Sequence, residues 1–314
     1  MTRAILEVKN LKQYFKIDHK TTIKAVDNVS FNIYEGEIFS VVGESGSGKS
    51  TLGRSIIRIY NANDGQVTFL DQSISGKLSP KQKKFLRLNM QMIFQDPMAS
   101  LNPRKKVLDT VAQGLDIHEN LSESERKQKV LDVLKSVGLS EDHITRYPHM
   151  FSGGQRQRIG IARAIIMNPQ FIIADEIISA LDVSIQAQVI NLMRQIQKEK
   201  NLTLMFIAHD LSMVRYISDR VAVMHLGHIV EMGNVEDIYD NPVHPYTKSL
   251  LSAIPHPDPM SEKVRRRVVY NHDSINYNEG VMNNISDSHS ILATPEELAA
   301  WKEKNYDNVL VLPQ

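Results

Sequence analysis

Two adjacent acidic residues follow an apolar run in the stretch FIIADEIISALD, which covers residues 171–182. The run from Phe171 to Ala174 predicts a short buried strand that ends at Asp175 and Glu176. Neighbouring carboxylates at such a strand end repel each other, and burying their charge is costly. A cation or a reacting water molecule would use such a pair, so we interpret it as a candidate catalytic or metal site.

A second stretch predicts phosphate binding. GESGSGKS, residues 43–50, follows an apolar segment at 38–42 and precedes the helix-like TLGRSIIRIY. The pattern is that of a phosphate-binding loop (P-loop), in which glycines let backbone amides surround phosphate oxygens at a helix N-terminus. Lys49 is then expected to reach the β- and γ-phosphates, and the Ser50 hydroxyl to bind Mg²⁺. The ATP-binding residues predicted here are Gly43, Glu44, Ser45, Gly46, Ser47, Gly48, Lys49, Ser50 and Thr51.

The P-loop suggests a role for each acid of the pair. Asp175, at the strand end, is expected to hold Mg²⁺ directly or through its water shell. Glu176 is the candidate general base that polarises the attacking water. The cation offsets one charge and the chemistry uses the other. A solvated acidic turn is the alternative, and it is favoured only when the pair is considered without the P-loop.

FSGGQRQR, residues 151–158, predicts a second phosphate-binding nest at the start of a helix. Its residues are Ser152, Gly153, Gly154 and Gln155. This stretch resembles the signature of ATP-binding cassette (ABC) ATPases, with Phe151 where Leu is commoner. The resemblance implies ATP and Mg²⁺ as cofactors, and a signature that closes over the ATP on another subunit's P-loop. It also implies an α/β fold, the P-loop NTPase ABC-ATPase fold, with a RecA-like catalytic core, an antiparallel β subdomain and a helical signature subdomain.

The remaining family motifs appear in order along the chain. The resemblance implies that Gln95, in FQDP, belongs to a Q-loop that senses Mg²⁺ and water. Asp182 is the acid of a D-loop, SALD, that crosses the dimer interface, and His209 in FIAHD is the switch histidine that contacts the γ-phosphate. Phe15 is the aromatic residue expected to stack on adenine, with Tyr14 as the alternative. Core packing explains Phe15 nearly as well.

Three longer stretches narrow the resemblance. ALDVSIQAQV, RYPHMFSGGQRQRIGIARA and NPVHPYTKSLLSAIPHPDP are similar to the ATPases of oligopeptide/dipeptide importers. The opening and the P-loop region resemble the F-type subunit of a Gram-positive oligopeptide permease. That family implies an ATPase that powers oligopeptide import as a peripheral protein on the cytoplasmic face of the cell membrane. The implied partners are a second ABC ATPase of the D type, two transmembrane permease subunits and an extracellular peptide-binding lipoprotein.

The sequence also departs from the family and leaves rivals open. Ile177 follows the candidate base where the family usually has Pro, which would loosen the turn at a cost of about 1 kcal/mol. The chain has no cysteine, so we expect no cysteine-bound iron–sulfur cluster of the kind some relatives carry. A related nickel or glutathione importer is the closest rival. A soluble, non-transport ABC ATPase is less favoured, because a single P-loop and a small helical insertion do not fit its known forms.

Composition limits the partners and the organisation. The 314 residues contain 37 Lys and Arg against 36 Asp and Glu, and 6% aromatic residues, so we expect no nucleic-acid partner. We expect neither a signal peptide nor a membrane span. The predicted organisation is an ABC ATPase domain at 1–240, with a helical subdomain at about 100–150, and an importer-type C-terminal extension at 241–314.

Local patterns predict the elements that position these motifs. Residues 38–42 are expected to form a buried parallel strand, 65–74 a strand, and 220–233 a hairpin that turns near Gly227. Residues 107–139 are expected to be helical, with a capping box at Ser122 and Glu125 and an end at Gly138. A further helix is expected to start at Thr294, with Pro295 and Glu297 completing its cap.

Overall fold

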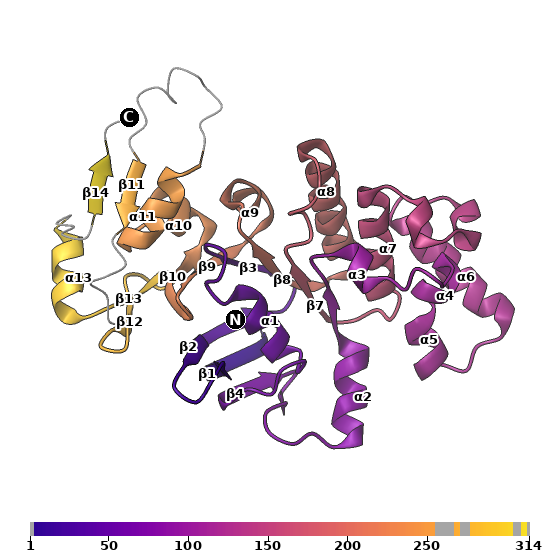
Figure 1. The fold of residues 1–314 in the computed structure, drawn as a ribbon, viewed down its shortest axis with the longest axis horizontal. Helices are drawn as coiled ribbons and strands as arrows, with labels where there is room; N and C mark the ends of the chain where they lie inside the picture. The colour runs from indigo at the N-terminus through magenta and orange to yellow at the C-terminus, as the bar shows by residue number, and fades with distance from the viewer. Residues whose placement is uncertain (1–2, 255–266, 271–276, 304–308, 313–314) are drawn as a thin grey trace.

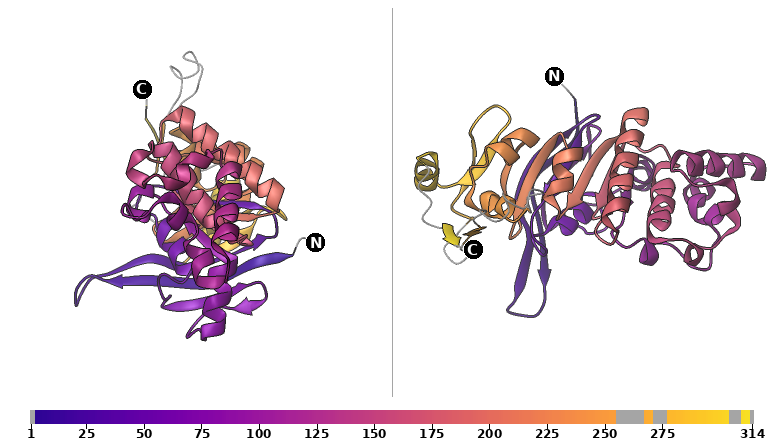
Figure 2. Two further views of the ribbon diagram at one scale, coloured as in Figure 1. Left: turned by 90° about the vertical axis from the view of Figure 1, so that its right-hand side faces the viewer. Right: turned by 90° about the horizontal axis from the view of Figure 1, so that it is seen from above.

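The computed structural model describes residues 3–254, 267–270, 277–303 and 309–312. A long sheet runs through the middle of the molecule, with a lobe of helices at one end and the C-terminal elements at the other (Figure 1). A smaller antiparallel sheet lies beside it, and its long β1–β2 hairpin projects from the body (Figure 2). Within the described residues, every helix is too short or too polar to cross a membrane.

The main sheet has eight strands in the order β12-β13-β10-β9-β3-β8-β7-β6. The strands from β9 to β6 are parallel, and β10, β13 and β12 are antiparallel to their neighbours. All residues of β3, β7 and β8 are buried, which confirms the predicted buried parallel strand at 38–42. The bounds are β3 (Ile38–Val42), β6 (Met90–Ile93), β7 (Phe171–Asp175), β8 (Thr203–Ala208), β9 (Arg220–His225), β10 (His228–Asn234), β12 (Val281–Asn284) and β13 (Ser290–Ala293).

Both faces of this sheet are covered. Phe39 and Val41 of β3 join one apolar cluster with helix α1 and the smaller sheet. Ile38 and Val42 point to the other face and join a cluster with α7 and α8. The alternation fixes the sheet between two layers, as expected for an α/β fold. The covering helices are α1 (Lys49–Ile56), α7 (Gly153–Ile165), α8 (Val183–Lys200) and α9 (Leu211–Ile217).

The smaller sheet is antiparallel, with the order β2-β1-β4-β5. The prediction of one strand at 65–74 was wrong, because a two-residue turn divides this stretch. Leu70 and Asp71 both have positive φ, 48° and 60°, which is the backbone geometry of a tight hairpin. The bounds are β1 (Ala4–Lys16), β2 (Thr22–Tyr34), β4 (Asp64–Phe69) and β5 (Gln72–Ser73).

The lobe at the far end of the main sheet is helical, as predicted for 107–139, although the region forms three helices rather than one. Ser122 caps the longest of them with a capping box to Glu125, and Gly138, with φ 72°, follows its end. Val130 and Leu134 of this helix face the core. The lobe contains α3 (Pro97–Ser100), α4 (Val107–Val111), α5 (Gln113–His118), α6 (Glu123–Ser136) and the 3₁₀ turns η1 (Glu141–Thr145) and η2 (Pro148–Met150). Helix α2 (Pro80–Asn89) precedes β6 outside this lobe, and its buried Leu86 joins the apolar cluster of the smaller sheet.

The C-terminal strands β12 and β13 continue the main sheet. The predicted hairpin at 220–233 is confirmed as β9 and β10, and β13 then pairs with β10 along its free edge. The predicted capping box at Thr294 and Glu297 is also confirmed. In the quoted stretch 241–259, residues 255–259 lie outside the described residues. The remaining elements are α10 (Val235–Asp240), α11 (Pro245–Ser252), β11 (Arg267–Tyr270), α13 (Pro295–Lys302) and β14 (Val309–Leu312).

A buried carboxylate ties this region to the sheet. Glu231 of β10 is 0% exposed and accepts hydrogen bonds from the amides of Val243 and His244, at 2.7 and 3.2 Å. Its Oε1 also lies 2.8 Å from Nε2 of His289, which precedes β13. Because a buried carboxylate is tolerated only when it is paired and hydrogen-bonded, these contacts fix the path of the chain around β10.

His244 caps the N-terminus of α11 from a fully buried position. Its Nδ1 accepts a hydrogen bond from the amide of Tyr246 at 3.1 Å. Burial, together with the smaller effect of the neighbouring His225, lowers the pKa of His244 to about 3. In the unfolded chain the imidazole binds a proton below about pH 6.5. The unfolded state therefore binds more protons at acidic pH, and stability is lost as the pH falls below about 6.5.

We predict that His244→Asn removes part of this pH dependence, because asparagine accepts the same capping hydrogen bond without titrating. Between pH 7 and pH 5, His244 is expected to cost the wild-type chain about 2 kcal/mol of unfolding free energy. Urea unfolding of both proteins at the two pH values measures the difference. Equal losses in wild type and variant would contradict a buried, neutral His244.

Candidate nucleotide-binding and catalytic site

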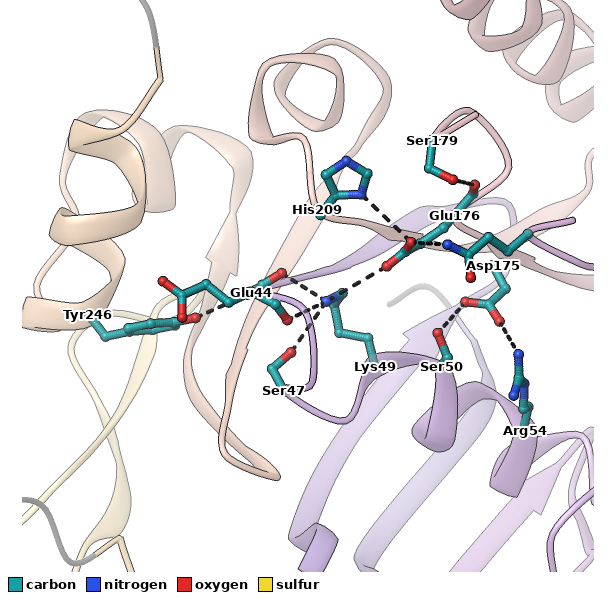
Figure 3. A network of polar contacts seen from close by, with 12 residues as sticks. Glu44, Ser47, Lys49, Ser50, Arg54, Asp175, Glu176, Ser179, His209 and Tyr246 are labelled. Atoms are coloured by element: carbon teal, nitrogen blue, oxygen red, sulfur yellow. Dashed lines mark hydrogen bonds and ion pairs between the residues drawn. The ribbon is translucent and has the colours of Figure 1, made fainter. Parts of the chain in front are cut away.

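The predicted site residues gather at one edge of the main sheet. The P-loop follows β3, Glu176 follows β7 and His209 follows β8. These three strands are parallel neighbours, so their carboxyl ends meet at the same edge, the usual location of ligand sites in such sheets. Figure 3 shows the side chains converging there from the three loops and from α1.

Three glycines with positive φ shape the P-loop, which leads directly into α1. Gly43, Gly46 and Gly48 have φ values of 149°, 84° and 106°, which side-chain-bearing residues rarely adopt. Gly48 is the N-cap of α1 and has no capping side chain, so the first amides of the helix face the loop. A helix N-terminus framed in this way suits a phosphate group.

Lys49 is held inside this loop. Its side chain is 3% exposed, and Nζ donates hydrogen bonds to the carbonyl oxygens of Gly43 and Glu44, both at 2.8 Å. Oγ of Ser47 lies 3.4 Å away. Burial lowers the pKa of Lys49, while Glu176 and Asp175 oppose that shift. The ammonium group therefore lies between the loop carbonyls and the acid pair.

Asp175 is fully buried at the end of β7. Its Oδ1 accepts a 2.7 Å hydrogen bond from the Ser50 hydroxyl, and its Oδ2 lies 3.4 Å from the Arg54 guanidinium. Ser50 and Arg54 are one turn apart on α1, so one face of the helix supplies both partners. The predicted metal residues Ser50 and Asp175 are thus in direct contact.

Glu176 lies at the centre of the predicted catalytic group. Its Oε2 accepts a 2.7 Å hydrogen bond from Nε2 of Gln95 and lies 3.8 Å from Nδ1 of His209. Its Oε1 is 4.0 Å from Nζ of Lys49. The His209 side chain is 52% exposed, so this side of the group is open to solvent. The structure brings these four predicted residues together, although Gln95 is far from the others in sequence.

The turn after β7 has an unusual backbone. Glu176 has a φ of 47°, its amide donates to the carbonyl oxygen of Ile207, and its own carbonyl accepts from the amide and the hydroxyl of Ser179. Ile177 is buried and packs in the main apolar cluster. Side-chain packing therefore holds position 177, while the expected loosening relative to Pro stays a prediction.

The predicted signature lies away from the P-loop. Ser152 caps α7 and forms a capping box with Gln155. Gly153 and Gly154 lie close to Leu181 and Ile185 respectively, around the predicted D-loop. Apart from the helical hydrogen bonds of α7, the hydrogen bonds of the signature in the described part of the chain stay within residues 152–156. Asp182, the N-cap of α8, is exposed.

The two adenine candidates differ in their contacts. Tyr14 donates a 2.5 Å hydrogen bond from its hydroxyl to Oδ1 of Asp27, and burial and this carboxylate raise its pKa to about 12. Phe15 is half-buried and packs edge-to-face on Tyr60, with 5.3 Å between ring centroids. The adenine role of Phe15 stays a prediction.

Sequence reasoning missed two contacts of the site. Arg54 was visible one turn after Ser50, at a spacing that places both on one helix face. Tyr246 had no local signal, since its partner is the amide of Glu44, 202 residues away in the chain.

Comparison with known proteins gives two family matches. Residues 26–179 match the model of the ABC transporter family. Residues 230–280 match the model described as "Oligopeptide/dipeptide transporter, C-terminal region".

Among curated proteins, the oligopeptide transport ATP-binding protein OppF of Streptococcus mutans is 56% identical over 96% of this chain and 98% of its own length. OppF of Bacillus subtilis is 55% identical over 96% of this chain and all of its own length. The dipeptide transport ATP-binding protein DppF of Lactococcus lactis is 52% identical over 96% and 97%.

Among solved structures, the ATP-binding cassette MJ0796 in a dimeric post-hydrolysis state with ADP and phosphate has a TM-score of 0.68 and 29% identity. It covers 73% of this chain and 98% of its own. CbiO1 of Clostridium perfringens has a TM-score of 0.67 and 29% identity, over 76% of this chain and 91% of its own.

Two glycine substitutions test the backbone of the P-loop. A Cβ on Gly43 would collide with the carbonyl oxygen of Met224, whereas a Cβ on Gly46 meets open space within 4 Å. We predict that Gly43→Ala lowers the unfolding free energy by about 3 kcal/mol, because the loop must shift. The matched Gly46→Ala carries only the cost of the left-handed backbone, about 1 kcal/mol. Urea unfolding compares them, and equal losses would contradict the close approach at Gly43.

Proposed function

This chain belongs to the ATP-binding proteins of ABC transporters, in the oligopeptide/dipeptide importer family, and from that premise we propose that it hydrolyses ATP to power peptide import through a membrane permease. The observation that carries the proposal is the group around Glu176. A carboxylate in contact with Gln95 and close to Lys49 and His209 suits the activation of water next to a bound phosphate.

The residues present fit a magnesium nucleotide. Mg²⁺ prefers oxygen ligands and usually keeps several waters, binding through one or two protein groups and the phosphates. The hydroxyl of Ser50 and the carboxylate of Asp175, 2.7 Å apart, offer such oxygens, and the carbonyl oxygen of Gln95 is the third proposed ligand. When bound, the cation would supply positive charge next to the phosphates and beside buried Asp175.

Each residue of the site then has a separate role in ATP binding and hydrolysis. Lys49 reaches the β- and γ-phosphates while the carbonyl oxygen of Gly43 continues to hold its ammonium group, and the amides at the start of α1 hold the phosphate oxygens. Glu176 accepts the proton of the attacking water, and Gln95 orients its carboxylate. His209 donates from its exposed side toward the γ-phosphate.

Hydrolysis is proposed to require a second ATPase subunit. Ser152 is exposed, and Gly153 and Gly154 lie near Leu181 and Ile185, which supports the use of this nest on a nucleotide held by a partner. The solved dimer of MJ0796 is a paired cassette, and this chain resembles it. We propose a D-type ATPase as the partner, with Asp182 at the interface and Phe15 on the adenine.

A groove beside the Q-loop suits the permease subunits. A cavity of about 700 Å³ lies between β6, the Q-loop and the helical lobe. Its lining includes Met92, Phe94, Gln95, Ile117, Arg163 and Met167. Gln95 thus contacts both the groove and Glu176, so a helix docked there would sense the state of the site. Two permeases would hold this chain on the cytoplasmic face of the membrane, with a lipoprotein delivering peptide outside.

The C-terminal region favours peptides over other cargo. The match of residues 230–280 to the oligopeptide/dipeptide transporter region and the names of the relatives support this choice over nickel or glutathione. We propose an ABC ATPase domain at 1–240, with its helical subdomain at about 100–150, and an importer extension at 241–314.

For Glu176, we predict that the Gln substitution leaves nucleotide affinity near the wild-type value and lowers the hydrolysis rate at least about 100-fold, because a carboxamide does not accept the proton. The rate is measured as phosphate release by the assembled complex. Glu236→Gln, on the exposed start of α10, is the control and should hydrolyse at the wild-type rate. Undiminished hydrolysis by Glu176→Gln would rule out its role as base.

The importer assignment is tested by purifying the tagged chain from detergent-solubilised membranes. We expect a second cassette ATPase and two multi-span permeases to copurify, and the reconstituted complex to take up labelled oligopeptides only with ATP. Uptake of nickel or glutathione instead of oligopeptides would overturn the assignment of oligopeptides as the cargo. Recovery of the chain alone, or with ribosomes or DNA, would overturn the importer itself.

A further inference from the structure

Tyr246, in the HPYT segment of the C-terminal region, touches the P-loop. The amide of Glu44 donates a 3.1 Å hydrogen bond to the Tyr246 hydroxyl. Figure 3 shows the phenol ring reaching Glu44 from the side opposite to Asp175 and Glu176. Through this contact, an element far along the chain takes part in the nucleotide site.

The contact acts on one end of a rigid unit. The N–H of Glu44 and the C=O of Gly43 belong to the same planar peptide group, and in a trans peptide they point in opposite directions. The Gly43 oxygen accepts the 2.8 Å hydrogen bond of Lys49. Tyr246 and Lys49 therefore hold the two ends of one peptide group, and rotation of that group would break both contacts.

Tyr246 is itself held firmly. It is 1% exposed, its ring lies 3.9 Å from the ring of His225 and 5.6 Å from that of Tyr270, and Nδ1 of His225 is 2.6 Å from the Tyr277 hydroxyl. Burial raises the pKa of Tyr246, so its hydroxyl stays neutral across the physiological range. The C-terminal region thus presents a fixed hydroxyl to the loop.

The other end of the loop is fixed from the same side of the fold. The amide of Gly227, in the β9–β10 turn, donates a 3.0 Å hydrogen bond to the carbonyl oxygen of Ser47. Gly43 passes close to the carbonyl oxygen of Met224, just before this turn. The β9–β10 turn therefore holds the Ser47 end of the loop, and Tyr246 holds the Gly43–Glu44 peptide.

We propose that Tyr246 is a positioning residue of the nucleotide site, whose hydroxyl orients the Gly43–Glu44 peptide and so places Lys49 for the phosphates. The proposal rests on the proposed function only in taking a nucleotide as the ligand. This role makes the C-terminal region part of the ATP site. Without the Tyr246 hydroxyl, the Gly43–Glu44 peptide can rotate, and a smaller fraction of molecules has the P-loop conformation that binds nucleotide.

The test compares two single-hydroxyl deletions in the full-length chain. Tyr246→Phe keeps the ring packing and removes the hydrogen bond to Glu44, whereas Tyr270→Phe removes a neighbouring hydroxyl of the same cluster. The probe is Mg²⁺ with AMP-PNP, titrated by calorimetry. We expect the Kd of Tyr246→Phe to rise about fivefold, the effect of one neutral hydrogen bond, and that of Tyr270→Phe to stay within about twofold.

Hydrogen exchange of the Glu44 amide distinguishes a positioning role of Tyr246 from a role in packing alone. The Glu44 amide should exchange faster in nucleotide-free Tyr246→Phe than in wild type, and at the wild-type rate in Tyr270→Phe. In the assembled complex, Tyr246→Phe should raise KM for ATP and leave kcat near its wild-type value, because the residue does not touch the reacting atoms.

Three results would overturn the proposal. They are unchanged AMP-PNP affinity in Tyr246→Phe, equal weakening in both variants, and unchanged exchange at Glu44. Failure of the wild-type chain to bind AMP-PNP is a different result, since it would remove the proposed ATPase function itself rather than the role of Tyr246.

Discussion

A buried ammonium group is the interaction on which the catalytic edge depends. Lys49 Nζ is almost fully withdrawn from water, and a cation is stable there only if oxygens surround it. Two of these oxygens are the carbonyls of Gly43 and Glu44, so the loop must curl back over its own helix start. That path needs positive φ at Gly43, Gly46 and Gly48, and it brings the loop against β9. The negative charges of Asp175 and Glu176, at the end of β7, offset the positive charge of Lys49. The first question that the sequence raised, why two carboxylates should stand at a strand end, therefore has a physical answer in the neighbouring cation.

The need to enclose Lys49 also explains why the C-terminal region contacts the P-loop. A loop that encloses Lys49 needs support from outside, and β9, the Gly227 turn and Tyr246 supply it. β10 pairs with β9, and β13 pairs with β10, so these strands are connected to the same support. Glu231, buried in β10, ties the chain before α11 to the same sheet. Hydrogen bonds that involve Val243, His244 and Tyr246 thus cross the predicted domain boundary near residue 240.

Local signals explain most of what could be predicted. The capping boxes at Ser122 and Thr294 involve groups three residues apart, and the P-loop pattern lies within eight residues, so each is readable from a short window. The structure places Gln95, Glu176 and His209 close together, while the catalytic roles that the family resemblance implies for them stay predictions. The pairing of β13 with β10 and the Tyr246–Glu44 contact are set by tertiary packing, and no short window contains both partners. The turn at Leu70 was missed for a different reason, since Leu is rare at positive φ and gave no turn signal.

The exposure of the site residues divides the site into two halves. Lys49 and Asp175 are buried and already hold their partners, so the half that would grip the phosphates is preorganised. His209, Asp182 and Ser152 are exposed to solvent in this single chain. Electrostatic stabilisation of a reacting phosphate weakens in water, so such an open half is a poor catalyst on its own. A second surface that covers His209 and brings its own nest would exclude that water. Under the proposed function, the chain is then half of an active site, and hydrolysis would depend on whether the two halves are closed. Because Gln95 contacts Glu176 and also lines the groove at the helical lobe, the same proposal would make that closure respond to a permease segment docked in the groove.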